Sequence, residues 1–493
     1  MSAKQQPGTP FASGSKRLFI GGEWVAAASG KEFDAINPAT GEAMARLAQA
    51  ETADVDKAVA AARRAFNGEW SRWKPYDRQR LLLRLLDLVE KNWEELALIE
   101  TLDMGAPLAR TRAMKSFASQ MILFFASHTN AGGVETPRNN LPGDFTTLRL
   151  KAPLGVVGGI LPWNAPLMSQ WWIVGGALAT GCTAVIKPAE DASLSVLRVA
   201  ELLQEAGMPE GVINIVTGFG HEAGAALAAH RDVDRINFTG SADTGRKIVQ
   251  ASAGNLKRVQ LELGGKSPDI IFADADLDKA VPGAGMGVYA NSGQICVAGT
   301  RLLVQRSIVD EFAQRLKEFS KTVRVGDPFD PQVQLGPLIS SKQLQRVMDY
   351  IEIGGQEGAQ LTQGGRRLGG ELAGGYFVEP TVFAGVNNDM RIAREEIFGP
   401  VASLIPFDTL EDALRIANDT NYGLAGGVWT RSLATAHKVV QGLQAGSVWV
   451  NAYGPLDPHF GFGGYKESGY GWKGGAEIVD SFLYQKAVYM NLG

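Results

Sequence analysis

Apolar positions in the first third of the chain recur every three or four residues, which is the period of a helix with one buried face. This pattern predicts helices over 52–66, 77–92 and 93–103. Thr52 is the expected N-cap of the first helix, with Asp54 and Asp56 in its first turn. Shorter alternating runs on either side of this helical layer predict strands within 19–25, 33–38 and 146–150.

From Gly155 onward the pattern changes to short apolar runs separated by glycine turns and helical segments. The expected strands are 156–160, 184–187, 212–216 and 235–238, and the expected helices are 193–206, 220–229 and 244–253. Strands and helices that alternate at this spacing form a parallel, doubly wound sheet, which binds ligands beyond the carboxyl ends of its strands. The pattern then starts again, with expected strands at 269–272, 302–304, 401–407 and 427–429, and predicts a second α/β domain.

Composition narrows the function classes. At 493 residues the chain is long enough for two or three domains, and its net charge of −4 gives no reason to expect a nucleic acid or an anionic membrane as partner. No apolar run approaches the roughly 20 residues that a membrane span needs. Two cysteines indicate a reducing compartment, here the cytoplasm. Residues 1–15 are rich in Ser, Gly, Pro and Gln, lack the apolar core of a secretion signal, and are expected to form a disordered tail.

Cys296 is the first candidate for chemistry. It lies between glycines in the segment 292–300, where the backbone can approach a ligand closely. A thiolate is a strong nucleophile near neutral pH when its pKa is lowered or a base takes its proton. The alternative is that Cys296 is a small buried hydrophobic residue.

Polar residues that follow the predicted strands are the next candidates. Asn164 stands between two prolines, where its side-chain NH2 can donate to a developing oxyanion; otherwise it forms a plain Asx turn. Lys187 and Glu190 can bind ribose hydroxyls, and a carboxylate there repels a 2′-phosphate. The alternative for this pair is a solvated charged turn.

Two more stretches have the same strand-to-turn context. The turn 238–245 leads from a strand through glycine into a helix, whose N-terminus offers free N–H groups to a phosphate. The nearby segment 218–223 formally matches GxGxxG/A, but no acidic ribose-binding residue follows about 20 residues later. Glu262 lies beside two glycines at a strand end and is a candidate general base with a raised pKa, or the partner of Lys266 in a structural salt bridge.

Glu396 precedes Phe398 by two residues, next to a Gly-Pro turn. Such an acid can clamp a ribose while the ring covers a flat group, although acidic pairs are usually solvated. Metal and serine-hydrolase chemistry are not predicted. The five histidines are scattered without the spacing of metal ligands, and the chain has no GxSxG elbow.

Together these stretches resemble the aldehyde dehydrogenase superfamily, in its non-acylating, NAD(P)-dependent branch. The resemblance runs in order from about Phe19 to the C-terminus, and its most specific parts are 238–241, 262–266 and 293–296. It implies an α/β fold with a Rossmann-like cofactor domain, a second α/β catalytic domain and a small oligomerisation sheet. The implied boundaries are a tail at 1–15, an NAD-binding domain at 16–130 and 154–264, a catalytic domain at 265–470, and an oligomerisation sheet at 131–153 and 480–493.

The resemblance also implies residue roles. Cys296 attacks the aldehyde to give a thiohemiacetal, Asn164 with the Cys296 backbone N–H binds the oxyanion, and Glu262 activates the water that hydrolyses the resulting thioester. NAD is the implied cofactor, with NADP less favoured because of Glu190. The expected cofactor contacts are Ile160, Trp163, Asn164, Lys187, Glu190, Gly220, Ser241, Thr244, Leu263, Glu396 and Phe398. The terminal strand at 481–490 has no partner close by in the sequence, which suggests that it pairs with another region of the chain or with another subunit. The resemblance implies that it joins the 131–150 stretch in one sheet, and that the protein is a homodimer or homotetramer.

The substrate is expected to be a hydrophobic aldehyde, aromatic or medium-chain aliphatic. The residues after Asn164 are expected to form a helix, and one face of this helix would line an entrance tunnel to the cysteine. Side chains on that face are small near the cysteine and aromatic further out, and two apolar neighbours of the cysteine lie beside them. These pocket residues are Ala165, Met168, Ser169, Trp172, Ile295 and Val297. The alternatives are a semialdehyde or betaine-aldehyde dehydrogenase, a CoA-acylating relative, a cysteine esterase or hydrolase, and a non-catalytic homologue. The alternative to the pocket-lining interpretation is that Trp171 or Trp172 simply packs in the core.

Overall fold

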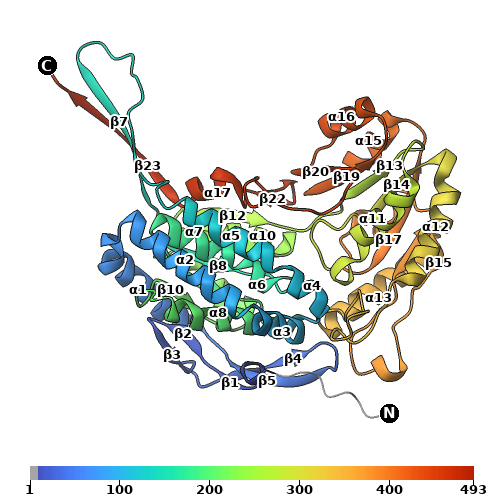
Figure 1. The fold of residues 1–493 in the computed structure, drawn as a ribbon, viewed down its shortest axis with the longest axis horizontal. Helices are drawn as coiled ribbons and strands as arrows, with labels where there is room; N and C mark the ends of the chain where they lie inside the picture. The colour runs from blue at the N-terminus through green and yellow to red at the C-terminus, as the bar shows by residue number, and fades with distance from the viewer. Residues whose placement is uncertain (1–8) are drawn as a thin grey trace.

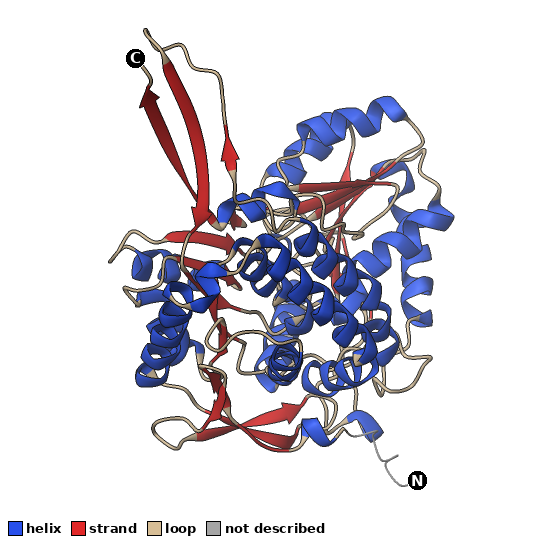
Figure 2. Cartoon of the chain, turned by 60° about the vertical axis from the view of Figure 1, so that its left-hand side comes forward, coloured by secondary structure: helices blue, strands red, loops and turns tan. Residues whose placement is uncertain are grey.

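The computed structural model describes residues 9–493, and two large β-sheets with helices on both faces account for most of them. One of the three smaller sheets projects from the molecule as an arm that ends near the C-terminus (Figure 1). Figure 2 shows the long strands of this arm extending well beyond the helical layers. In the part of the chain that is described, no helix is long and apolar enough to cross a membrane.

The first sheet has eight strands in the order β22-β12-β11-β8-β9-β10-β2-β3. The five strands from β12 to β10 are parallel, and the edge strands β22, β2 and β3 run antiparallel to their neighbours. The bounds are β2 Leu18–Ile20, β3 Glu23–Val25, β8 Val156–Ile160, β9 Thr183–Lys187, β10 Ile213–Ile215, β11 Arg235–Thr239, β12 Arg258–Glu262 and β22 Gly469–Tyr470. The parallel, doubly wound sheet predicted from the alternating pattern is confirmed.

Alternate residues of each central strand enter different cores, which explains why these strands are apolar throughout. In β8, Val157 belongs to the core on one face and Val156 to the core on the other. The first core is covered by α2 Pro75–Lys91, α3 Trp93–Met104, α5 Lys115–Ser127, α7 Trp171–Thr180 and α8 Leu194–Glu205. The second is covered by α1 Thr52–Asn67, α9 Ala225–Ala229 and α10 Ala242–Ser252.

The second sheet has seven strands in the order β15-β16-β17-β14-β13-β19-β20, all parallel except β15. Its strands also alternate between two cores, with Ile270 in one and Ile271 in the other. The strand bounds are β13 Pro268–Ile271, β14 Arg301–Gln305, β15 Gln360–Gln363, β16 Thr381–Ala384, β17 Val401–Phe407, β19 Ala425–Trp429 and β20 Ser447–Val450. The main helices are α11 Leu277–Tyr289, α12 Val309–Thr322, α13 Ser341–Gln356, α15 Leu410–Asn418 and α16 Leu433–Gly442.

The arm is a three-stranded sheet made from two distant segments of the chain. β23 (Leu483–Asn491) pairs antiparallel with β7 (Phe145–Pro153) along its whole length, and β6 (Val134–Glu135) pairs with the other side of β7. The terminal strand therefore finds its partner within the same chain. The remaining elements are β1 Gly14–Lys16, β4 Glu32–Asn37, β5 Glu42–Ala48, β18 Tyr422–Gly423, β21 Tyr465–Lys466, α4 Leu108–Ala113, α6 Pro166–Ser169, α14 Arg391–Arg394 and α17 Gly475–Ser481.

Two predictions near the N-terminus were wrong. Residues 1–8 of the expected disordered tail lie outside the described residues, but 9–15 form a 3-10 turn and then β1, which pairs with β5. The Thr9 hydroxyl donates to Glu95 and Ala12 is buried, so tertiary contacts outweigh the polar composition here. The N-cap of α1 is Glu51, which shares a capping box with Asp54, and not Thr52.

Candidate active site

The carboxyl ends of four neighbouring parallel strands carry most of the predicted site residues. β8 leads into 161–164, β9 into 187–190, β11 into 239–241, and β12 ends at Glu262. Because these strands are parallel and adjacent, their following residues meet at one edge of the sheet. Residues that are far apart in the sequence therefore lie close together in space.

The loop that carries Cys296 has an unusual backbone. After α11, three consecutive residues have left-handed conformations, with φ of 55° at Asn291, 56° at Ser292 and 73° at Gly293. A Cβ at Gly293 would lie 2.1 Å from the carbonyl oxygen of Gly399, so only glycine fits. Strain of this kind persists only where the surroundings hold it, and it is concentrated at functional sites.

Hydrogen bonds from the second domain hold this loop. The Ser292 hydroxyl donates to the Gly336 carbonyl over 2.8 Å, and the Ile339 N–H donates to Oε1 of Gln294 over 2.9 Å. Residues 291–294 are buried, whereas Ile295 and Cys296 are partly exposed. The loop thus emerges from the protein interior at the cysteine.

Asn164 is tied directly to the cysteine loop. Its Nδ2 donates to the Gln294 carbonyl over 2.8 Å, and Nδ2 of Asn291 donates to the Asn164 backbone carbonyl over 3.1 Å. A side-chain amide has two N–H donors, so the second can serve an oxygen bound next to Cys296. Asn164 is therefore a fixed donor and not a free Asx turn.

Glu262 is buried, with 2% of its side chain exposed, and its Oε1 has no hydrogen-bond partner. The nearest cation is Lys473, whose Nζ lies 3.9 Å from Oε2 of Glu262. Burial raises the pKa of Glu262 to about 8, and the charge of Lys473 opposes the rise. The alternative of a salt bridge with Lys266 was wrong, because Nζ of Lys266 is buried without a partner. Sequence reasoning missed Lys473, which belongs to no motif.

Desolvation raises the pKa of the Cys296 thiol to about 12, and the negative charge of Glu262 adds to the rise. Lys473 acts in the opposite direction on the thiol as well. The protein alone therefore keeps the sulfur as a neutral thiol at pH 7. Two acidic groups whose charges interact in this way titrate as a pair.

The end of β9 carries a paired cation and anion. Nζ of Lys187 is 2.7 Å from Oε2 of Glu190, and the Gly220 N–H donates to Oε1 of Glu190 over 3.5 Å. Burial lowers the pKa of Lys187, and the charge of Glu190 opposes that shift. The predicted helix at 220–229 begins as a π-helical turn over 220–224 and becomes α-helical as α9. Three predicted cofactor residues thus lie together.

The turn after β11 also has the predicted form. Ser241 is the N-cap of α10, and its Oγ accepts from the Thr244 N–H over 3.3 Å. Both residues are exposed at the helix N-terminus, whereas Ile160 and Leu263 are buried nearby in the same core. The exposed N–H groups of α10 can bind an anion.

Glu396 and Phe398 belong to the second domain and lie against this edge of the first sheet. Oε1 of Glu396 accepts from the Gly265 N–H over 3.0 Å, and burial raises the pKa of Glu396 to about 7. The rings of Phe398 and Trp163 meet edge to face, with centroids 5.2 Å apart. Phe398 has a φ of 62°. The predicted cofactor contacts from the two domains therefore face one another.

The four residues predicted to line the pocket after Asn164 share the same degree of exposure. Ala165, Met168, Ser169 and Trp172 are partly exposed, whereas the intervening 166–167 and 170–171 are buried. The expected single helix is divided into α6 and α7, which meet at Gln170. Trp171 is packed in the core, which was the alternative interpretation for this residue, and Trp172 packs edge to face on Phe125.

The cysteine side of the pocket differs from the prediction in one residue. Ile295 is partly exposed, but Val297 is buried against Leu424 and Ala425, so it does not form an open wall. Two aromatic residues that sequence reasoning missed, Trp449 and Phe462, belong to the same apolar cluster as Cys296. Only their aromatic character could have drawn attention to them, Trp449 in the short strand β20 and Phe462 in the segment after it.

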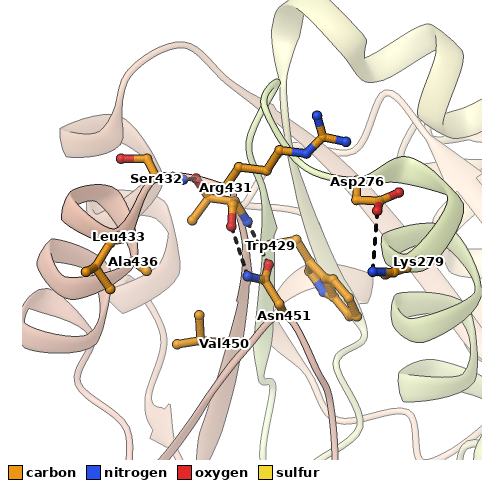
Figure 3. A pocket seen from close by; sticks show the side chains of 10 residues that line it. Asp276, Lys279, Trp429, Arg431, Ser432, Leu433, Ala436, Val450 and Asn451 are labelled. Carbon is orange, nitrogen blue, oxygen red and sulfur yellow. Dashed lines mark hydrogen bonds and ion pairs between the residues drawn. The ribbon is translucent and has the colours of Figure 1, made fainter.

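A separate cavity of about 370 Å³ lies at the far side of the second sheet, between β19, β20, α16 and the start of α11 (Figure 3). It contains none of the predicted site residues, and its polar groups pair with one another, for example Asn451 with Thr430. Within residues 9–493, no cluster of three His, Cys, Asp or Glu side chains could hold a metal ion.

Comparison with known proteins gives concordant matches over nearly the whole chain. The model of the aldehyde dehydrogenase family matches residues 24–488. An aldehyde dehydrogenase of Alternaria alternata is 47% identical over 481 residues, 97% of this chain and 95% of that protein. The structure of betaine aldehyde dehydrogenase from Staphylococcus aureus in complex with NAD+ has a TM-score of 0.95 at 39% identity, over 97% of this chain and 95% of that one. The aldehyde dehydrogenase KauB from Pseudomonas aeruginosa gives 0.94 at 44% identity, over 97% of both chains.

Proposed function

The chain belongs to the aldehyde dehydrogenase family, and from this premise we propose that it oxidises a hydrophobic aldehyde to the carboxylic acid, with NAD as cofactor and Cys296 as nucleophile. The main support is the meeting of a thiol, a fixed amide donor and a buried carboxylate at one edge of the first sheet. Oxidation of an aldehyde to an acid needs these three groups and a hydride acceptor. A cysteine hydrolase would need no dinucleotide site, and a non-catalytic homologue would need neither Cys296 nor Glu262.

The surroundings fit NAD. Lys187 and Glu190 would hold the adenosine ribose, the N-terminus of α10 at Ser241 would face the diphosphate, and Glu396 with Phe398 would hold the nicotinamide end. When bound, NAD accepts a hydride at C4 of its nicotinamide. The carboxylate of Glu190 gains hydrogen bonds from free ribose hydroxyls but repels a 2′-phosphate, which favours NAD over NADP.

The protein groups act in sequence. The Cys296 thiol gives its proton to solvent water, and the resulting thiolate bonds to the aldehyde carbon to form the anion of a thiohemiacetal. Its oxygen receives hydrogen bonds from Nδ2 of Asn164 and the backbone N–H of Cys296. Loss of the hydride leaves a thioester on Cys296. Glu262, in its carboxylate form, then takes a proton from water, the resulting hydroxide attacks the thioester carbon, and the acid leaves as the carbon–sulfur bond breaks.

The substrate class follows from the pocket lining. Met168 and Trp172, with Ile295, Trp449 and Phe462, give it apolar walls near Cys296. Burial of each CH2 group contributes about 0.8 kcal/mol, so longer apolar aldehydes should be favoured. A carboxylated semialdehyde would need a cation for its tail, and none of these side chains is one.

Assembly as a homodimer or homotetramer is supported by the arm. Large side chains of β23 and its end are exposed there, among them Tyr484, Tyr489 and Leu492. We divide the chain into an NAD-binding domain built on the first sheet, a catalytic domain built on the second, and the arm as the oligomerisation sheet. Both cysteines are free, which fits a reducing location such as the cytoplasm.

The direct test is NADH formation, followed at 340 nm, with a panel of aldehydes in the presence and absence of CoA. Cys296→Ala should lower the rate far below a hundredth of the wild-type rate, since the covalent route is lost. Cys182→Ala is the matched control, because Cys182 is fully buried away from the site and should leave the rate nearly unchanged. A Cys296→Ala variant that keeps more than about a hundredth of the rate would contradict the assignment.

A further inference from the structure

Lys473 lies between β22 and α17 and reaches the site from the C-terminal segment. Its Nζ is 3.9 Å from Oε2 of Glu262 and donates to the Thr239 hydroxyl over 2.8 Å. Only 13% of its side chain is exposed. A lysine with so little exposure is costly unless its charge is paired and hydrogen-bonded, and here Glu262 and Thr239 are the partners.

The backbone around Lys473 is held on both sides. Its N–H donates to the Phe462 carbonyl over 2.7 Å, and the Phe462 ring belongs to the apolar cluster around Cys296. Just before it, Gly469 in β22 is the pairing partner of Glu262 itself. A single short segment therefore fixes the position of the ammonium relative to both the carboxylate and the thiol.

We propose that Lys473 is a positioning residue for aldehyde oxidation, whose ammonium, anchored on Thr239, favours the carboxylate form of Glu262 and offsets the negative charge that develops on Cys296. The proposal rests on the function proposed above, since only an ionised Glu262 can accept a proton from water. It requires no contact between Lys473 and the substrate.

The charges in the site explain why a cation is needed. Glu262 faces Lys473 from the C-terminal segment and Cys296 from the loop after α11, and Glu396 also acts on Cys296. Three groups that are anionic when ionised thus share a poorly solvated space, where each disfavours ionisation of the others. Lys473 is the cation that counteracts burial at Glu262 and lowers the pKa of the thiol. Its removal should raise the pKa of both groups.

The test is the rate of Cys296 alkylation by iodoacetamide at fixed pH values between 7 and 9, in the protein without added cofactor. The thiolate is the reacting form, so Lys473→Met should lower this rate by about 10- to 1000-fold, the effect of removing a close opposite charge, and Lys473→Arg should restore much of it. Lys247→Met is the matched control, because Lys247 is exposed on α10 and the substitution changes the net charge equally. Cys182 is fully buried and does not interfere.

The same variants are then assayed for NADH formation between pH 6 and 10. Lys473→Met should shift the acid limb of kcat to higher pH, in the same direction as the loss of alkylation rate, while the melting temperature shows that the protein is folded. If Lys473→Met does not fold, Lys473→Gln replaces it, since an amide can still donate to Thr239 without a charge. An unchanged alkylation rate and an unshifted pH profile of kcat, in a folded variant without the Lys473 charge, overturn the proposal for Lys473. Failure of the wild-type protein to oxidise any aldehyde would instead overturn the proposed function, while the alkylation result still decides the electrostatic role.

Discussion

Glu262→Gln separates the two halves of the proposed reaction. The substitution keeps the size of the side chain and removes its ability to accept a proton from water. Burial holds the pKa of Glu262 above its usual range, so protonated Glu262 is favoured toward low pH. Its carboxylate form increases as pH rises, so wild-type deacylation should accelerate between pH 7 and pH 9.

General base catalysis contributes about 10²–10⁴-fold, so the steady-state rate of Glu262→Gln at pH 9 should fall by about that factor. Hydride transfer comes earlier and does not need the base for water. Rapid mixing of enzyme, NAD and aldehyde should therefore show an NADH burst close to one per active site, then a slow phase that no longer depends on pH. Glu371→Gln, at an exposed position remote from the site, should behave as wild type. Equal loss of burst and steady phase would refute the reasoning and assign Glu262 to activation of the thiol.

Three further predictions test other parts of the site. Gly293→Ala should reduce kcat by about a hundredfold or more, because the added Cβ would clash with the Gly399 carbonyl and displace Cys296. Gly355→Ala is the control and should leave kcat unchanged, since Gly355 faces open space on α13. A fully active Gly293→Ala variant would show that the loop is not strained. Glu190→Gln should narrow the difference in kcat/KM between NAD and NADP. Equal kcat/KM values for the two cofactors in the wild-type enzyme would show that the adenosine ribose does not bind at Glu190. Finally, kcat/KM should climb from acetaldehyde to hexanal or benzaldehyde, and a flat response or a preference for succinic semialdehyde would contradict the apolar pocket.

Much of the fold could be predicted because its central strands are apolar on both faces and bounded by glycine turns. β8 and β17 have the predicted bounds for this reason. Motif residues at strand ends were also predictable, since parallel strands bring their carboxyl ends together. The Glu262, Lys187–Glu190 and Ser241 positions all follow from that rule.

Features that depend on contacts between distant segments could not be predicted. Lys473 approaches Glu262 only because β22 pairs with β12, and a two-residue strand leaves almost no periodic signal. Residues 9–15 are likewise ordered because they pair with β5 and contact Glu95, although their composition favours disorder. The burial of Val297 depends on Leu424, which is remote in sequence. Local patterns carry no information about these pairings.

The position of β22 has a consequence for how the protein is made. The first sheet begins with β2 near the N-terminus but is completed beside Glu262 by residues 469–470, so its edge stays open until almost the whole chain has been synthesised. Domains form as the chain leaves the ribosome, N-terminal parts first. We therefore expect a nascent chain to form most of the first sheet before β22 and Lys473 reach Glu262, and activity to appear only on release from the ribosome. A chain truncated before β22 should be inactive for the same reason.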